Sequence, residues 1–110
     1  MAYDAGLLAL LREDLTETQG VAEKKMFGGV CLMLSGHMLC GVHKDGGMFR
    51  VGKDNYAAAL AINGARPLGF TGRPMGGMVD VDDAAMGDDE KRHALLALAL
   101  NFVESLPPKG

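Results

Sequence analysis

Hydrophobic and polar positions alternate through residues 30–51, and two turn sequences interrupt the alternation. Ser35-Gly36 and Asp45-Gly46 each stand between apolar runs. A pair ending in glycine in that setting is typical of a two-residue β-hairpin turn, because such turns need positive φ at their central residues. The segment therefore predicts three antiparallel strands that follow one another along the chain.

Two-residue turns at these pairs would also fix which residues face each other. We expect Met33 opposite Met38, Cys31 opposite Cys40, and His43 opposite Met48. Side chains alternate between the two faces of a sheet, so the strands sort into two sets. The uncharged set is predicted to be the core and contains Cys31, Met33, Met38, Cys40, Val42, Phe49 and Val51. The mixed set contains Val30, Leu32, Leu34, His37, Leu39, His43, Met48 and Arg50.

Helical spacing of apolar residues appears on both sides of these strands. Residues 4–18 carry leucines spaced by three and four, and Asp4 is a suitable N-cap. A long helix is expected from Asp88 to about residue 106. A short helix is expected over residues 55–62, with Asp54 as its cap.

Further short strands are expected over residues 21–26, 66–70 and 75–81. The consecutive glycines of Phe27-Gly28-Gly29 predict a bulge, a sharp bend or the close approach of another backbone. The order of elements predicts an α+β domain with two layers. We expect a mainly antiparallel sheet of about five strands, helices at both ends, one short middle helix, and a single domain over residues 1–110.

Composition changes this picture in three respects. Methionine is abundant, with 8 residues, while aromatic residues make up only 5% of the 110, so adaptable thioethers are expected to fill much of the core. The net charge of −3 disfavours direct nucleic-acid binding, although it leaves room for a local basic patch. No apolar run approaches the roughly 20 residues of a membrane span. The N-terminus does not resemble a signal peptide, and cytoplasmic localisation is the expectation.

The two cysteines allow three interpretations. In the expected register Cys31 and Cys40 face each other with Cα atoms about 4.5 Å apart, which is within the range of a disulfide. In a reducing cytosol we favour two buried thiols packed beside Met33 and Met38. The alternatives are a redox-switchable bridge and a site for a soft metal ion such as Cu(I).

No arrangement of residues typical of catalysis is found in the sequence. It contains no nucleophile elbow, no phosphate-binding loop and no His/Cys spacing suited to a metal. His37 and His43 would lie roughly 20 Å apart along one strand, too far to share an ion. We therefore expect a non-enzymatic domain without a cofactor.

The mixed face is more apolar than a solvated face should be. If helices cover the opposite face, Leu32, Leu34 and Leu39 are left partly bare. An exposed apolar patch of this kind usually marks an interface, and self-association covers it most simply. We therefore expect a homodimer.

Several motifs resemble those of one known family. Lys25-Met26-Phe27-Gly28-Gly29, followed by a glycine-turn hairpin, the strand Met48-Phe49-Arg50-Val51 and then Pro67-Leu68-Gly69-Phe70, resembles the N-terminal domain of the TfoX/Sxy family. The segment from Phe70 to Gly77 and the closing Ser105-Leu106-Pro107-Pro108-Lys109 are similar to a stand-alone branch of that family. The resemblance covers about residues 5 to 109.

The resemblance implies an α+β domain with an antiparallel sheet of about five strands. Family members with known roles regulate natural competence, act with a transcription activator at promoters, and carry a second, C-terminal helical domain. We expect this chain to be a stand-alone N-terminal-type domain that lacks the second one.

The function we favour is a regulatory or protein-interaction domain whose partner, such as a transcription factor or a polymerase subunit, presents acidic surface to basic side chains. The candidate binding residues are Lys24, Lys25, Phe27, Gly28, Gly29, Arg50, Arg73 and Met75. Plainer interpretations are edge-protecting charges for Lys24 and Lys25, and a salt bridge for Arg50. The alternative function is a small homodimeric domain that binds a ligand or soft metal, or acts in redox, through Cys31, Cys40 and the methionines.

Overall fold

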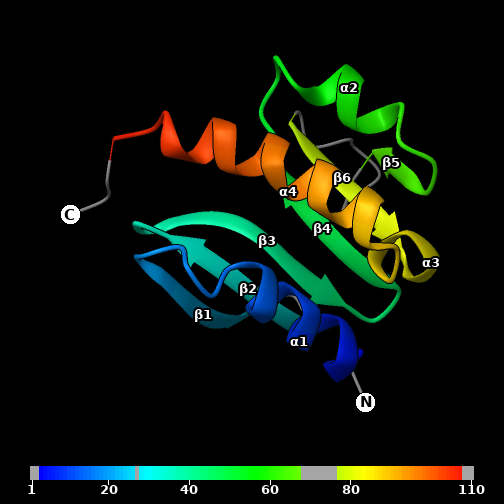
Figure 1. Ribbon diagram of the computed structural model, residues 1–110, viewed down its shortest axis with the longest axis horizontal. Helices are drawn as coiled ribbons and strands as arrows, with labels where there is room; N and C mark the ends of the chain where they lie inside the picture. Colours follow the sequence, from blue (N-terminus) through cyan, green and yellow to red (C-terminus); the bar gives the residue numbers. More distant parts are fainter. Residues whose placement is uncertain (1–2, 27, 68–76, 108–110) are drawn as a thin grey trace.

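The computed structural model describes residues 3–26, 28–67 and 77–107 and has an α+β fold (Figure 1). Its one antiparallel sheet has the strand order β1-β2-β3-β4-β6-β5. The strands are β1 Val21–Met26, β2 Gly29–Leu34, β3 His37–His43, β4 Gly46–Arg50, β5 Ala65–Pro67 and β6 Met78–Asp82. The helices are α1 Ala5–Asp14, α2 Tyr56–Leu60, α3 Asp83–Met86 and α4 Asp89–Glu104. The predicted fold class is confirmed, with six strands instead of about five.

The helix ends are explained by side-chain caps. The Asp4 carboxylate accepts hydrogen bonds from the backbone N–H groups of Gly6 and Leu7, at 2.8 and 3.3 Å, as predicted for an N-cap. Asp88 caps α4 in the same way. The predicted cap of α2 is wrong, because the N-cap is Asn55 and not Asp54. The Asn55 amide instead donates to the carbonyl oxygens of Val51 and Leu98, which ties the start of α2 to α4.

One face of the sheet is covered by α1 and α4, which lie across β1 to β4 in Figure 1. Their leucines pack with β-branched and aromatic side chains of the strands, and we call this cluster the main core. Its buried members from the strands are Val30, Leu32, Leu34, Leu39, Cys40, Val42, Phe49, Val51, Val79 and Val81. In the described residues, no helix is long and apolar enough to cross a membrane.

The register predicted for β2 and β3 is right at the turn and wrong beyond it. Ser35 and Gly36 have φ of 51° and 86°, as a two-residue turn of this type requires, and Met33 pairs with Met38. The register then shifts, so that Leu32 pairs with Cys40 and Leu39 is left as an extra residue. This is a β-bulge, which places two residues of one strand opposite one of the other.

The bulge divides each of the two predicted faces. Leu39 and Cys40 both enter the main core, whereas Cys31 joins Met48 and Met78 in a separate buried cluster against which Met33 and Met38 pack. The predicted assignment to the core face was therefore wrong for Cys31, Met33 and Met38, which lie on the other face of the sheet. The predicted bare face was wrong as well, because Leu32, Leu34 and Leu39 are at most 5% exposed. The argument for a homodimer from that face falls with it.

The second hairpin turns one residue earlier than predicted, which shifts the pairing of β3 with β4 by two residues. His43 pairs with Gly46 and Gly41 with Met48, so the turn residues are Lys44 and Asp45. Glycine is needed at position 46 for another reason, since its φ is 145° and a Cβ there would lie 2.1 Å from the Val81 carbonyl oxygen. A shift of two residues keeps every side chain on its face, so this difference leaves the assignment of faces in β3 and β4 unchanged.

The glycine corner between β1 and β2 confirms the predicted close approach of another backbone. A Cβ on Gly29 would lie 1.9 Å from the carbonyl oxygen of Val42, far inside contact distance. Only glycine lets β2 and β3 pair at this point.

Gly29→Ala is expected to lower the free energy of unfolding by about 3 kcal/mol, because the added methyl group must push a buried backbone aside. Urea unfolding followed by circular dichroism measures the effect. Gly87→Ala is the matched control: Gly87 has φ of −80° and its nearest neighbour would be 3.5 Å from the new Cβ, so its stability should stay within about 1 kcal/mol of wild type. Equal losses in the two variants would contradict the close approach at Gly29.

Candidate functional site

The basic candidates Lys24 and Lys25 lie on β1, the first strand of the sheet order. Both are exposed, and no ion pair to either is found in the described residues. Their neighbour Glu23 is neutralised by Arg12 of α1, whose guanidinium donates to the carboxylate at 2.6 and 2.7 Å. Lys24 pairs with Cys31 and Lys25 with Val30, so the two ammonium groups extend on opposite faces of this edge.

The glycine candidates lie at the end of the same hairpin. Gly28 is exposed with φ of 75°, and Gly29 begins β2 opposite Met26. The candidates Phe27, Arg73 and Met75 lie outside the described residues. Of the predicted binding residues, the structure thus brings together Lys24, Lys25, Gly28 and Gly29.

Arg50 lies apart from this group, at the last residue of β4, whereas Gly29 packs against Val42 and His43 beside the first residue of β4. Its guanidinium carbon lies 5.4 Å from the centre of the Phe102 ring on α4, a cation–π contact instead of the expected salt bridge. Arg50 and Phe102 line a shallow hollow of about 350 Å³ together with Gly52, Lys53, Asp54 and Gly77. The predicted basic residues therefore form two surfaces.

The structure keeps Cys31 and Cys40 apart, against the alternatives of a redox-switchable bridge or a soft-metal site shared by the two. Both thiols are free and fully buried, but Cys40 belongs to the main core and Cys31 to the cluster on the other face of the sheet. Burial raises the pKa of both thiols, so both are protonated at neutral pH. The bulge is the physical reason for this separation, because it turns the Cys40 side chain to the face of the sheet opposite that of Cys31.

Three polar side chains form a chain across the sheet on the face opposite the helices. The backbone N–H of Asp45 donates to Nδ1 of His43 at 3.1 Å, so the ring is protonated at Nε2. Nε2 donates to Oδ1 of Asp80 at 2.6 Å, and Arg66 donates to Oδ2 of Asp80 at 2.7 Å. Each imidazole nitrogen and each carboxylate oxygen thus has a hydrogen-bond partner, and the chain of contacts links β3, β6 and β5.

A second polar cluster, which the sequence analysis missed, joins α1 to α4. Arg92 is 2% exposed and donates to Oδ2 of Asp14 at 2.6 Å, to Asp89 at 2.7 Å and to the carbonyl oxygen of Met86 at 2.9 Å. His93 donates to Oδ1 of Asp14 at 2.9 Å. The signal was present in the spacing, since Arg92 stands three residues before Leu95 and thus on the apolar stripe of α4.

In the described part of the chain, every buried side-chain nitrogen and oxygen has a hydrogen-bond partner, and no group of three or more His, Cys, Asp or Glu lies together as metal ligands. The polar clusters thus serve the connection of elements. Two candidates for recognition remain, the basic edge at β1 and the hollow beside Arg50 and Phe102.

Comparison with models of known protein families gives a match. The model of the TfoX N-terminal domain matches residues 13–103. The chain belongs to the TfoX N-terminal domain family. Comparison with curated proteins and with solved structures gives no match.

The matched part of the TfoX N-terminal domain contains the whole sheet, α2, α3 and all but the last residue of α4. It also contains Asp14, Arg92 and the basic edge of β1. Most of α1 precedes the matched residues and is held to them through Asp14.

Asp14 gives this TfoX N-terminal domain a pH dependence of stability. Burial by itself would raise the pKa of Asp14, but hydrogen bonds from Arg92 and His93 outweigh it and lower the pKa below its ordinary value of 3.8. A carboxyl group with a lowered pKa stabilises the fold fully above its unfolded pKa, and loses this contribution as pH falls through the folded pKa.

Asp14→Ala should lower the free energy of unfolding by about 3 kcal/mol at neutral pH, because it leaves Arg92 as a buried, half-compensated charge. The difference from wild type should shrink below pH 3.8, the ordinary pKa of Asp14. Urea unfolding between pH 2 and 7 measures both effects. Arg12→Met is the control, since its ion pair with Glu23 is exposed and should contribute little at any pH. A constant difference between Asp14→Ala and wild type over this range would contradict the account.

Proposed function

We propose that this TfoX N-terminal domain is a non-enzymatic regulatory module that acts by protein contact in transcription control, the kind of role that the family resemblance implies for regulators of competence. Such a role places it in the cytoplasm. The observation that carries the proposal is the outer edge of β1, a six-residue strand with two lysines to which the described residues supply no ion pair.

An edge strand presents unpaired backbone N–H and C=O groups that can pair with an extended segment of another protein. Of the two edges of the described sheet, β5 has only three residues and ends in Pro67, which has no N–H to donate. The six-residue β1, with residues 22–25 all exposed, is the better receptor for a strand.

Charge selects the kind of partner. Arg12 neutralises Glu23, so the charge left at this edge is that of Lys24 and Lys25. An added strand with acidic side chains on both faces would meet one lysine on each face, whereas two copies of β1 would bring lysines together. The proposed partner is therefore an acidic extended segment of a protein of the transcription machinery.

The hydrogen-bond arrangement supports a role without catalysis. The described residues contain two histidine–carboxylate contacts. In the contact between His43 and Asp80, both ring nitrogens of His43 have hydrogen-bond partners. In the contact between His93 and Asp14, both carboxylate oxygens accept hydrogen bonds, one from Arg92 and one from His93. Asp80 and Asp14 thus bind side chains that connect elements of the fold, which is a structural role.

The proposal predicts that a synthetic extended peptide with the repeat Glu-Glu-Val-Val, which carries Glu on both faces of a strand, will shift the amide NMR signals of residues 21–26. Lys24→Glu/Lys25→Glu should abolish these shifts, because it replaces attraction by repulsion. Lys53→Glu/Lys91→Glu makes the same charge change elsewhere and should leave them unchanged. A peptide with the repeat Lys-Lys-Val-Val should not bind the wild type.

Two results would contradict the proposal. The first is shifts with the acidic peptide that survive in Lys24→Glu/Lys25→Glu. The second is tight binding of a DNA duplex whose affinity falls steeply with salt, about one unit of log slope for each phosphate contacted, because this indicates direct nucleic-acid contact. A wild-type dimer dissociated by the same double substitution would indicate that β1 pairs with a second copy instead.

A further inference from the structure

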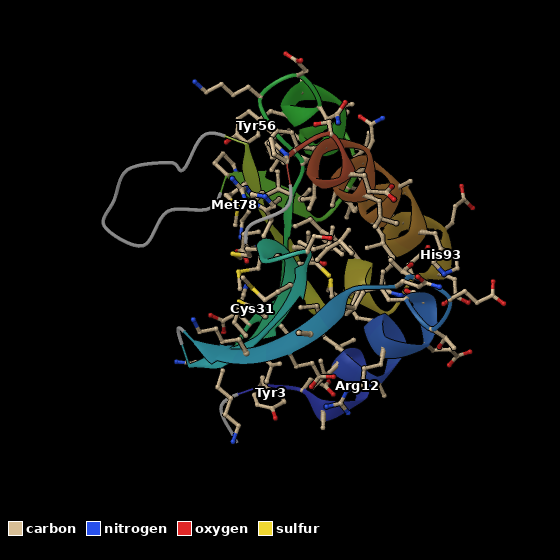
Figure 2. The ribbon with its side chains drawn as sticks, turned by 90° about the vertical axis from the view of Figure 1, so that its left-hand side faces the viewer. Tyr3, Arg12, Cys31, Tyr56, Met78 and His93 are labelled. Carbon is tan, nitrogen blue, oxygen red and sulfur yellow. The ribbon has the colours of Figure 1, made fainter. Side chains whose placement is uncertain are left out.

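A hollow in the surface lies where β4 leaves the sheet, beside the C-terminal half of α4. We call it the Arg50 hollow. Its volume is about 350 Å³, and its lining residues are Arg50, Gly52, Lys53, Asp54, Gly77 and Phe102. Figure 2 marks its neighbourhood by Met78, which pairs with Arg50, and by Tyr56 at the start of α2. None of these lining residues belongs to β1 or α1, so the hollow is separate from the basic edge.

The buried floor of the Arg50 hollow is glycine backbone that hydrogen bonds hold in place. The carbonyl oxygen of Gly77 accepts from the backbone N–H groups of Val51 and Gly52, at 2.8 and 3.0 Å. Gly52 and Gly77 both have φ of 83°, a conformation that residues with a side chain rarely adopt. A Cβ on Gly52 would lie 2.3 Å from the Phe102 ring, so the ring packs directly against this backbone. The glycines therefore let the ring form one wall of the hollow and keep side chains out of its floor.

The Phe102 ring in turn orients Arg50, whose guanidinium carbon lies 5.4 Å from the ring centre. Stacking on a ring uses a face of the guanidinium group, whereas its N–H donors point outward within its plane. The described residues supply no carboxylate within ion-pair distance of Arg50 and no acceptor for a hydrogen bond from it. Arg50 thus presents oriented, charged donors at the side of the hollow, which suits an anion.

Lys53 and Asp54 complete the charge of the Arg50 hollow. Two cations and one carboxylate leave it with one net positive charge, in a chain whose net charge is −3. One net positive charge favours a ligand with a single anionic group. A nucleic acid needs many cations along its phosphates, which this hollow does not offer.

Size and donor geometry indicate the class of ligand. The planar fork of a guanidinium group matches the two oxygens of a carboxylate or a phosphate. A volume of about 350 Å³ lies at the lower end of the range for pockets that bind small molecules. We propose that the Arg50 hollow binds a small organic molecule by its carboxylate or phosphate group. Arg50 donates two parallel hydrogen bonds to this group, and Lys53 adds positive charge.

This inference goes beyond the proposed function and is independent of it, since the hollow shares no residue with β1. The probes are sodium phosphate and sodium acetate, each added to ¹⁵N-labelled protein while sodium chloride keeps the ionic strength constant. At least one of them should shift the amide signals of residues 50–54 and the side-chain Nε–H signal of Arg50, and the shifts should saturate. The anion that binds more tightly identifies the group, phosphate or carboxylate. The signals of residues 21–26, which report on the acidic peptide, should stay in place.

Matched variants locate the site. Arg50→Lys keeps the positive charge but lacks the planar fork, so it should weaken binding at least about ten-fold, which is what a hydrogen bond to a charged group contributes. Arg50→Gln removes both the fork and the charge and should abolish the saturable shifts. Arg12→Gln makes the same change at a site that Figure 2 labels far from Met78 and Tyr56, and it should bind like the wild type.

Three results would overturn the inference. One is a wild-type chain in which neither anion gives saturable shifts at residues 50–54. Another is undiminished binding by Arg50→Gln or Arg50→Lys with thermal unfolding unchanged. The last is an equal loss of binding in Arg12→Gln, which would indicate a response to the total charge of the chain instead of a site.

Discussion

A single extra residue in β3 determines which side chains the sheet gives to each of its faces. Met33 of β2 pairs with Met38 of β3, but the preceding residue of β2, Leu32, pairs with Cys40, so Leu39 has no partner in β2. The shift places Val30, Leu32 and Leu34 on the same face as Val42, Phe49 and Val51, beneath α1 and α4. The bulge costs about one hydrogen bond between the strands, which is about 1 kcal/mol of stability. Each valine or leucine side chain that becomes fully buried contributes about 1.5–3 kcal/mol, so the burial outweighs the lost hydrogen bond.

The same shift separates two kinds of apolar packing. The helix-covered face is packed with leucine, valine and phenylalanine, and the other face with methionine and one cysteine. Polar groups connect the parts at their margins, with Arg92 holding α1 to α4 and Asp80 holding β3 to β5 through β6. The edge strand β1 is the part of the described sheet that keeps both unpaired charge and an open side. This edge is where we propose contact with another protein.

Local signals in the sequence were sufficient to predict the helices and strands, but not to predict which strand side chains lie on each face of the sheet. Asp4, Asp88 and the Ser35-Gly36 turn act as predicted, because caps and tight turns depend on a few neighbouring residues. The glycine at Gly29 was also correctly linked to a close backbone approach. The bulge at Leu39 has no residue signature, since its benefit comes from α1 and α4, which lie far away in sequence. Arg92 was missed for a related reason, because its partner Asp14 is 78 residues away.

Inter-strand NOEs of β2 and β3 test the position of the bulge most directly. The account predicts backbone NOEs that pair Met33 with Met38 on one side of Leu39, and Leu32 with Cys40 on the other. The Cys31 β-protons should show NOEs to the methyl group of Met48, and the Cys40 β-protons only to main-core residues. Backbone NOEs that pair Cys31 with Cys40, together with contacts from both cysteines to the same methionines, would contradict it.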